Sequence, residues 1–124
     1  MKPASCKAKG RSFQNWLCEQ IGRYFYLFPP DVKPAMMSES GMDIKLSSAA
    51  RSIFPYAIEA KNVEKLNVWE AWKQAQTNAE KENLTPLLFI KRNRTAPLMI
   101  IDAETGFQIL QENARLKNFL REEQ

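Results

Sequence analysis

The sequence contains no histidine among its 124 residues. This absence excludes a histidine general base, a Ser-His-Asp or Cys-His nucleophile, and a metal site built on imidazole ligands. Cysteine is scarce as well, because Cys6 and Cys18 are too few to form a disulfide scaffold. Any catalysis by this chain therefore depends on carboxylates and lysine, with or without a hard metal ion.

Long apolar runs are also missing. No stretch of eighteen apolar residues occurs, so we expect no membrane-spanning helix. The first eleven residues are basic and polar and lack the apolar centre of a signal peptide, which predicts an intracellular, cytoplasmic protein. The length and the composition, 44% hydrophobic and 26% charged, predict a single domain over residues 1–124.

Positive charge is concentrated in the first half of the chain. The net charge of +4 comes entirely from residues 1–61, because basic and acidic residues balance over 62–124. Residues 1–11 form a basic arm, and a second basic cluster separates two apolar runs. Such segments bind polyanions, DNA or RNA, although a solubilising tail and a charged turn would have the same composition. The basic residues are Lys2, Lys7, Lys9, Arg11, Lys91, Arg92 and Arg94.

Hydrophobic periodicity predicts an α/β fold, with a small mixed β-sheet flanked by helices. Ser12 and Asn67 are suitable N-caps for two of the helices. Residues 47–52 are predicted to be a loop. Helices are expected over 12–25, from 67 onward and over about 104–124, and strands over 42–46, 54–61, 87–91 and 98–101.

Three residues, two acids and a lysine, form a pattern that is typical of metal-dependent hydrolysis. Asp43 lies on one predicted strand, and Glu59 and Lys61 share a face of the next, because side chains alternate along a strand. If the strands are neighbours, two carboxylates and an ammonium group converge. Two carboxylates suit Mg²⁺, which lowers the pKa of a bound water and stabilises charge on a phosphoryl oxygen, while a lysine orients the attacking water. An ordinary charged strand face would show the same pattern.

Four segments together resemble the PD-(D/E)xK nucleases. They are residues 7–11, 38–43, 54–62 and 67–71 with Gln74, and their order and spacing over residues 7–94 are more specific than any one segment. Within that superfamily the chain resembles the archaeal-type Holliday junction resolvases and their phage relatives. The resemblance implies a restriction-endonuclease-like core and a divalent-metal endonuclease that cuts four-way DNA junctions as a homodimer.

The same resemblance implies roles for individual residues. Asp43 and Glu59 would bind Mg²⁺ or Mn²⁺, Lys61 would position the water, and Gln74 would lie beside the site. Gln14 occupies a position where the archaeal enzymes usually carry glutamate, so it can contact a metal or its water but adds no charge. The implied DNA contacts are Lys7, Lys9, Arg11, Ser38, Ser40, Lys91, Arg92 and Arg94.

Two alternatives to a junction resolvase remain open at the level of sequence. The same nuclease core serves enzymes that cut flaps, other branched DNA or duplex DNA, so the fold does not choose the substrate. A non-catalytic DNA-binding module is the third hypothesis, and Gln14 in place of a glutamate favours it. For Gln74 a solvated helix position, and for Ser40 a turn, are the structural interpretations.

Overall fold

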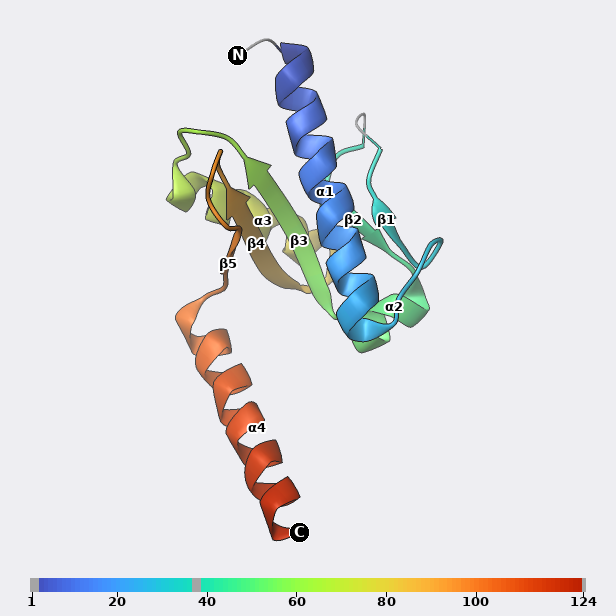
Figure 1. The fold of residues 1–124 in the computed structure, drawn as a ribbon, viewed down its shortest axis with the longest axis vertical. Helices are drawn as coiled ribbons and strands as arrows, with labels where there is room; N and C mark the ends of the chain where they lie inside the picture. Colours follow the sequence, from blue (N-terminus) through green and yellow to red (C-terminus); the bar gives the residue numbers. More distant parts are fainter. Residues whose placement is uncertain (1–2, 37–38, 124) are drawn as a thin grey trace.

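The computed structural model describes residues 3–36 and 39–123, which form four helices and five strands in a small α/β protein (Figure 1). Two small sheets are present in this part of the chain, and the larger is a mixed three-stranded sheet packed against helices. The elements are α1 (Pro3–Phe25), β1 (Val32–Pro34), β2 (Ile44–Leu46), α2 (Ser48–Ile53), β3 (Tyr56–Asn62), α3 (Val68–Glu82), β4 (Thr85–Lys91), β5 (Leu98–Ile100) and α4 (Ala103–Glu122).

The order of the strands places β4 at the centre of the three-stranded sheet. β3 pairs with β4 in parallel, with Ile58 opposite Leu87, and β5 pairs with β4 in antiparallel orientation. α3 forms the crossover between the two parallel strands, as parallel pairing requires. β1 and β2 form a separate antiparallel pair, which lies on the far side of β3 from β4 (Figure 1).

Helices cover both faces of β3 and β4. On one face, Phe13 and Leu17 of α1 pack in a buried cluster that includes Ile58 and Leu87. On the other face, small side chains of α3, among them Ala75, pack against Leu88 and allow a close approach of helix and sheet. The alternation predicted along residues 54–61 is thereby confirmed, because Ile58 faces α1 whereas Ala57 packs with Ala79 of α3.

Several local expectations need correction. Asp43 does not lie on a strand, because β2 begins at Ile44, and β2 pairs with β1 and not with β3.

The first helix begins at Pro3, so Ser12 is not its N-cap and the basic arm from Pro3 onward is the first part of α1. Residues 47–52 do not form a loop, because the Ser47 side chain accepts the amide of Ala50 and starts α2. β1 was not expected, since three residues are too few to show a period. The N-cap at Asn67 is confirmed, as its side chain accepts the amide of Glu70.

No helix in the described parts of the chain is long and apolar enough to cross a membrane.

Candidate metal and nucleic-acid site

Asp43 is fixed to the edge of β3 at two points. Its amide donates to the carbonyl of Ile58 at 2.9 Å, and its carboxylate Oδ2 accepts the amide of Ala60 at 2.7 Å. Gly41 makes the preceding turn with φ of +100°, a conformation that side chains disfavour, and Met42 then packs into the core beside α3. The turn and the two hydrogen bonds bring Asp43 next to the strand that carries Glu59 and Lys61.

Glu59 is buried between β3 and α3, with only 2% of its surface exposed. Its Oε2 accepts the Nδ2 of Asn78 at 3.0 Å, and its Oε1 lies 3.4 Å from the Nζ of Lys61. Asn78 also donates to the carbonyl of Gly41 at 3.2 Å. One amide on α3 therefore connects the Glu59 carboxylate to the turn that positions Asp43.

The electrostatics of the pair are unfavourable for two ionised acids. Burial raises the pKa of Glu59 to about 7, and the negative charge of Asp43 adds to this rise, while Asn78 and Lys61 oppose it. Burial also raises the pKa of Asp43, although the Ala60 amide and Lys61 favour its ionised form. Desolvation and mutual repulsion thus outweigh the attraction of the Lys61 ammonium group, and an added cation would stabilise the ionised pair.

A cavity of about 200 Å³ lies over Asp43 at the side of α1. Gln14 is half-buried and lines this cavity together with Asp43. Lys7 and Arg11 line it as well. Within residues 3–36 and 39–123, no group of three Asp, Glu, Cys or His side chains is placed to hold a metal ion. A metal here would have two carboxylates, with amide and water oxygens completing its shell.

Gln74 and Ser40 are not brought to the acidic pair in the way that Gln14 and Asn78 are. Gln74 is exposed on α3, and Asn78, one turn further along, is the residue that contacts Glu59. Ser40 is exposed and lines a different cavity, which it shares with Glu39 and Glu82. Ser38 lies outside the described residues. Sequence reasoning missed Asn78, although a polar residue within the buried alanine stripe of α3 was the available signal.

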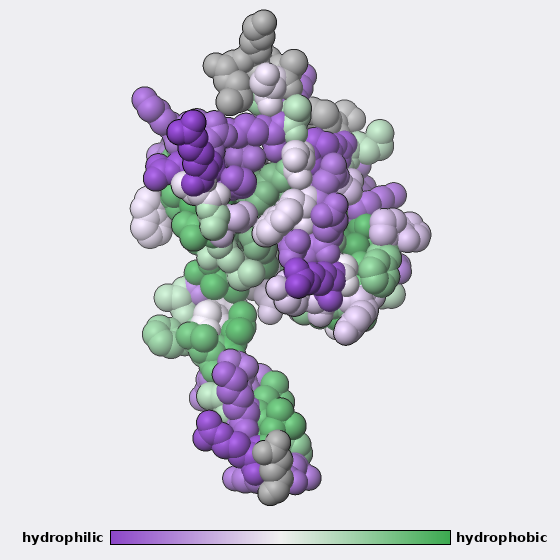
Figure 2. Space-filling model, in the orientation of Figure 1, coloured by the Kyte–Doolittle hydropathy of each residue, from purple (hydrophilic) through white to green (hydrophobic). Residues whose placement is uncertain are grey.

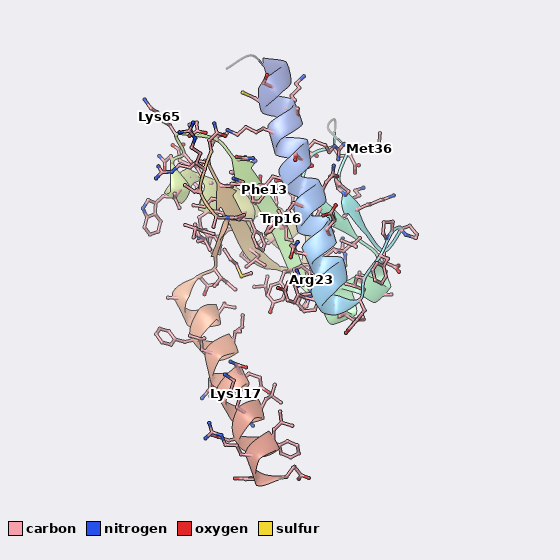
Figure 3. The ribbon with its side chains drawn as sticks, in the orientation of Figure 1. Phe13, Trp16, Arg23, Met36, Lys65 and Lys117 are labelled. Atoms are coloured by element: carbon pink, nitrogen blue, oxygen red, sulfur yellow. The ribbon has the colours of Figure 1, made fainter. Side chains whose placement is uncertain are left out.

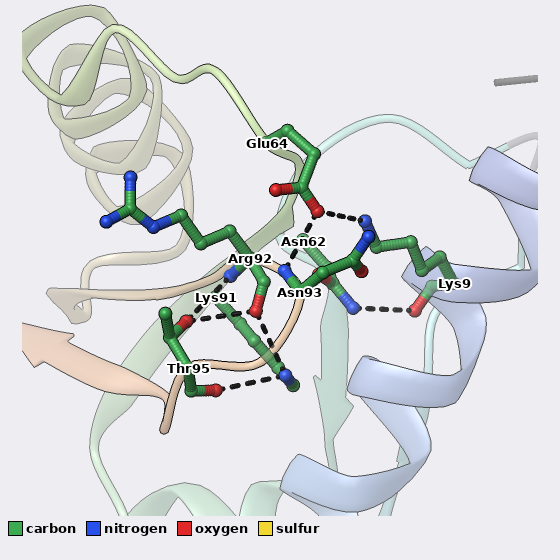
Figure 4. A network of polar contacts seen from close by, with 7 residues as sticks. All are labelled: Lys9, Asn62, Glu64, Lys91, Arg92, Asn93 and Thr95. Carbon is green, nitrogen blue, oxygen red and sulfur yellow. Dashed lines mark hydrogen bonds and ion pairs between the residues drawn. The ribbon is translucent and has the colours of Figure 1, made fainter.

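Three of the predicted basic residues, Lys9, Lys91 and Arg92, lie where α1 meets the β4–β5 turn (Figure 4). Glu64 connects these segments, because its Oε1 accepts the Nζ of Lys9 at 3.1 Å and the amide of Asn93 at 2.9 Å. Both hydrogen bonds lower the pKa of Glu64. The Asn62 side chain adds a hydrogen bond to the carbonyl of Lys9. These hydrogen bonds therefore hold the N-terminal part of α1 next to the β4–β5 turn.

The same contacts divide the basic residues into two groups. Lys9, Arg11 and Lys91 are half-buried and donate to protein groups: Lys9 to Glu64, Arg11 to the carbonyl of Ala35, and Lys91 to carbonyls of its own turn. The second group, Lys7, Lys65, Arg92 and Arg94, is exposed. Lys7 lines the cavity over Asp43. The other three lie on the β3–α3 loop and the β4–β5 turn, where Figure 2 shows a hydrophilic corner and Figure 3 labels Lys65. We call Lys65, Arg92 and Arg94 the basic corner.

Arg94 has a backbone conformation that few side chains adopt. Its φ is +63°, in the left-handed region, at the turn closed by the Thr95 amide donating to the carbonyl of Arg92. Glycine or asparagine fits this position with less strain. The arginine therefore puts an exposed guanidinium at the tip of the turn at some conformational cost.

Comparison with known proteins adds no relative: no family model matches the chain, and no curated protein or solved structure matches it significantly.

The pH dependence of stability tests the electrostatics of the acidic pair. Without added metal, the unfolding free energy of the wild type should fall as the pH rises from about 4.5 to 7, because the folded state holds the Glu59 proton more tightly than the unfolded chain. The loss should be on the order of 3 kcal/mol. Glu59→Gln removes the charge, so this variant should be the more stable protein near pH 8 and equal to wild type near pH 4.5.

Urea denaturation in EDTA at the two pH values measures this difference. Glu80→Gln is the matched control, because Glu80 is exposed on α3 and should show no pH-dependent gain. Equal stability of wild type and Glu59→Gln near pH 8 would contradict the proposed repulsion.

Proposed function

We propose that this protein is a divalent-metal-dependent, structure-selective DNA endonuclease that hydrolyses phosphodiesters at four-way junctions. The observation that carries the proposal is the convergence of Asp43, Glu59 and Lys61 at the edge of β3. Asp43 and Glu59 are sixteen residues apart in the sequence, and the Ala60–Asp43 and Asn78–Glu59 hydrogen bonds hold their carboxylates at the edge of β3. The mixed sheet with helices on both faces is consistent with a restriction-endonuclease-like core.

The residues present fit a hard metal ion. Asp43 and Glu59 would hold Mg²⁺ or Mn²⁺, with Gln14 near enough to the cavity to bind the ion or one of its waters. Mg²⁺ keeps several waters and uses one or two protein carboxylates, which agrees with a site of two acids. The raised pKa of Glu59 is what an acidic pair lacking its counter-ion would show. When bound, the ion would activate water and stabilise charge on the phosphate.

The protein groups have distinct parts in this proposal. Lys61 is near Glu59 and half-buried, so its ammonium can orient the attacking water or stabilise the phosphate oxygens. Asn78 is a positioning residue, because it holds one oxygen of Glu59 and the Gly41 carbonyl at once. The hydrogen bond from the Ala60 amide keeps Asp43 oriented and favours its ionised form.

The basic corner supports a nucleic-acid substrate. Its cations come from the β3–α3 loop and the β4–β5 turn, and the contact of Glu64 with the Asn93 amide joins these segments. Exposed cations from separate segments suit a phosphate backbone, which lies across several elements of a protein surface. Branch selectivity within DNA substrates rests on the family resemblance.

A second candidate is a DNA-binding module without turnover. Gln14 favours it, because the side chain that lines the cavity beside Asp43 carries no charge and would bind a metal more weakly than glutamate. A nuclease of flaps, other branched DNA or duplex DNA would use the same site and differ only in the substrate that it selects.

Metal binding can be tested without cleavage. Mg²⁺ should raise the melting temperature of the wild type, because an ion that binds only the folded state stabilises it by mass action. At a hundredfold excess over Kd the gain is about 2.7 kcal/mol, or a Tm rise of about 10 °C for a domain of this size. Asp43→Asn should lose this rise, whereas Glu80→Gln should keep it. An equal rise in all three proteins would place the ion elsewhere.

Cleavage of a labelled immobile four-way junction, beside linear duplex of the same sequence, tests the function. We expect paired symmetric nicks in the junction with Mg²⁺ and none in EDTA. Lys61→Ala should lower the rate by about 10²–10³-fold, as expected when a group that stabilises the transition state is removed. Lys73→Ala, which removes an exposed lysine of α3, should leave the rate unchanged.

The outcomes separate the candidates. Equal cutting of the duplex would retain the nuclease and remove the junction specificity. Tight binding to DNA without cutting, with either Mg²⁺ or Mn²⁺, would favour the binding module. Cleavage by Lys61→Ala at the wild-type rate would remove Lys61 from the mechanism.

Binding measurements test the basic corner. Arg92→Ala/Arg94→Ala should weaken junction binding and lower the slope of log K against log salt by about 2, since each phosphate contact contributes about 0.9. Lys73→Ala/Lys81→Ala removes the same charge from the exposed side of α3 and should change the slope little. An equal loss for both pairs would show that net charge, and not the corner, attracts DNA.

A further inference from the structure

The helix α4 projects away from the rest of the molecule (Figure 1). None of its residues is buried, although it is twenty residues long. Asp102 caps α4 by accepting the amide of Thr105. The first turn contacts the body through Gly106, which lies beside Ile101, and Ile101 packs against the main core. The helix is therefore anchored at one end and unsupported along the remainder of its length.

Large apolar side chains are exposed on α4, and Figure 2 shows hydrophobic residues along one side of the helix and hydrophilic residues along the other. Phe107 is 72% exposed and Leu110 is 63% exposed. A contiguous apolar surface of this kind in a water-soluble chain marks a contact with another molecule. The large apolar residues are Phe107, Ile109, Leu110, Leu116, Phe119 and Leu120. One side of the helix is wholly polar and carries Glu104, Gln108, Gln111, Arg115, Asn118 and Glu122. Other polar residues, Glu112, Asn113, Lys117 and Arg121, lie between the apolar ones around the helix.

The charges of α4 are arranged in opposite halves. Residues 103–112 contain two acids and no base, whereas residues 113–122 contain three bases and one acid. Glu112, Arg115 and Lys117 lie in the middle of α4, between its first and last turns. The helix macrodipole acts mainly on the two end turns, so it does not account for the order of these charges. A second α4 running in the opposite direction would place acidic halves beside basic halves.

We propose that α4 is a dimerisation helix, which packs in antiparallel orientation on α4 of a second copy of this chain. One contact of this kind covers the apolar surface of both helices at once. Because the contact is two-fold symmetric and uses the same surface on both copies, it closes as a dimer.

The composition of α4 argues against other occupants. Its net charge is zero over residues 103–122, so it lacks the cation excess that draws a helix to nucleic acid or to an anionic lipid surface. The polar side carries acids as well as bases, unlike that of a membrane-surface helix. The acidic and basic halves complement each other, and a second copy supplies both.

The inference does not depend on the proposed nuclease activity. It rests on the exposure, hydrophobicity and charge order of α4 alone, and its tests measure mass and cross-linking. A protein without any cleavage activity could still form this dimer, and a monomeric nuclease would contradict only the dimer.

Light scattering after size exclusion tests the assembly. The full chain should elute with twice the chain mass. Leu110→Glu/Leu120→Glu should raise the dimer dissociation constant at least tenfold and give the monomer mass. Gln111→Glu/Asn118→Glu adds the same charge on the polar side of α4 and should remain a dimer. A monomeric wild type, or an open series of larger species, would overturn the proposal.

Cross-linking tests the antiparallel direction and needs no destabilising variant. In a Cys6→Ser protein, Asn113→Cys at the middle of α4 should form a disulfide-linked dimer under mild oxidation, because residues near the two-fold axis meet their own copies. Arg121→Cys should not, since antiparallel packing separates its two copies by about 24 Å. The remaining thiol, Cys18, is half-buried, and burial raises its pKa to about 11. Cross-linking at both positions would indicate parallel helices, and cross-linking at neither would contradict the pairing.

Discussion

The attachment of Asp43 to the edge of β3 is the contact on which the candidate site depends. The backbone of Asp43 bonds to Ile58 and its side chain to Ala60, so one residue serves both as an extension of the sheet and as an acid of the site. The carbonyl of Asp43 also accepts the amide of Ala35, next to the end of β1. Any change that moves this segment therefore moves an acid and a sheet edge together.

The electrostatic cost of this arrangement falls on Glu59. A carboxylate with 2% exposure is stable in its charged form only with nearby positive charge, and here a single lysine ammonium, 3.4 Å from Oε1, is close by. An apolar residue at position 59 would pack against α3 without this cost. Buried polar groups that reduce stability are found where binding or catalysis requires them, and this is the physical basis for treating the pair as a site.

The parts of this structure that could be predicted from sequence are those with a long regular pattern. β3 is seven residues long, and side chains alternate in direction along a strand, so the shared face of Glu59 and Lys61 was predictable. β1 and α2 were not, because three and six residues give too little periodicity and α2 depends on the Ser47 cap. To predict that Asn78, and not Gln74, contacts Glu59 would have required knowing which side of α3 packs on the sheet. Asn78 falls in the alanine stripe at Ala71, Ala75 and Ala79, where a polar side chain requires a partner.

The positions of the basic corner and of α4 on either side of β5 make the two proposed surfaces compatible. The β4–β5 turn precedes β5, and α4 follows it, so the three-residue strand separates Arg94 from the helix. In Figure 1 the turn and the start of α1 lie at one end of the molecule and α4 extends from the other. Pairing through α4 would leave the basic corner of each copy exposed. Two acidic sites would then belong to one symmetric particle, as the cutting of two equivalent strands requires.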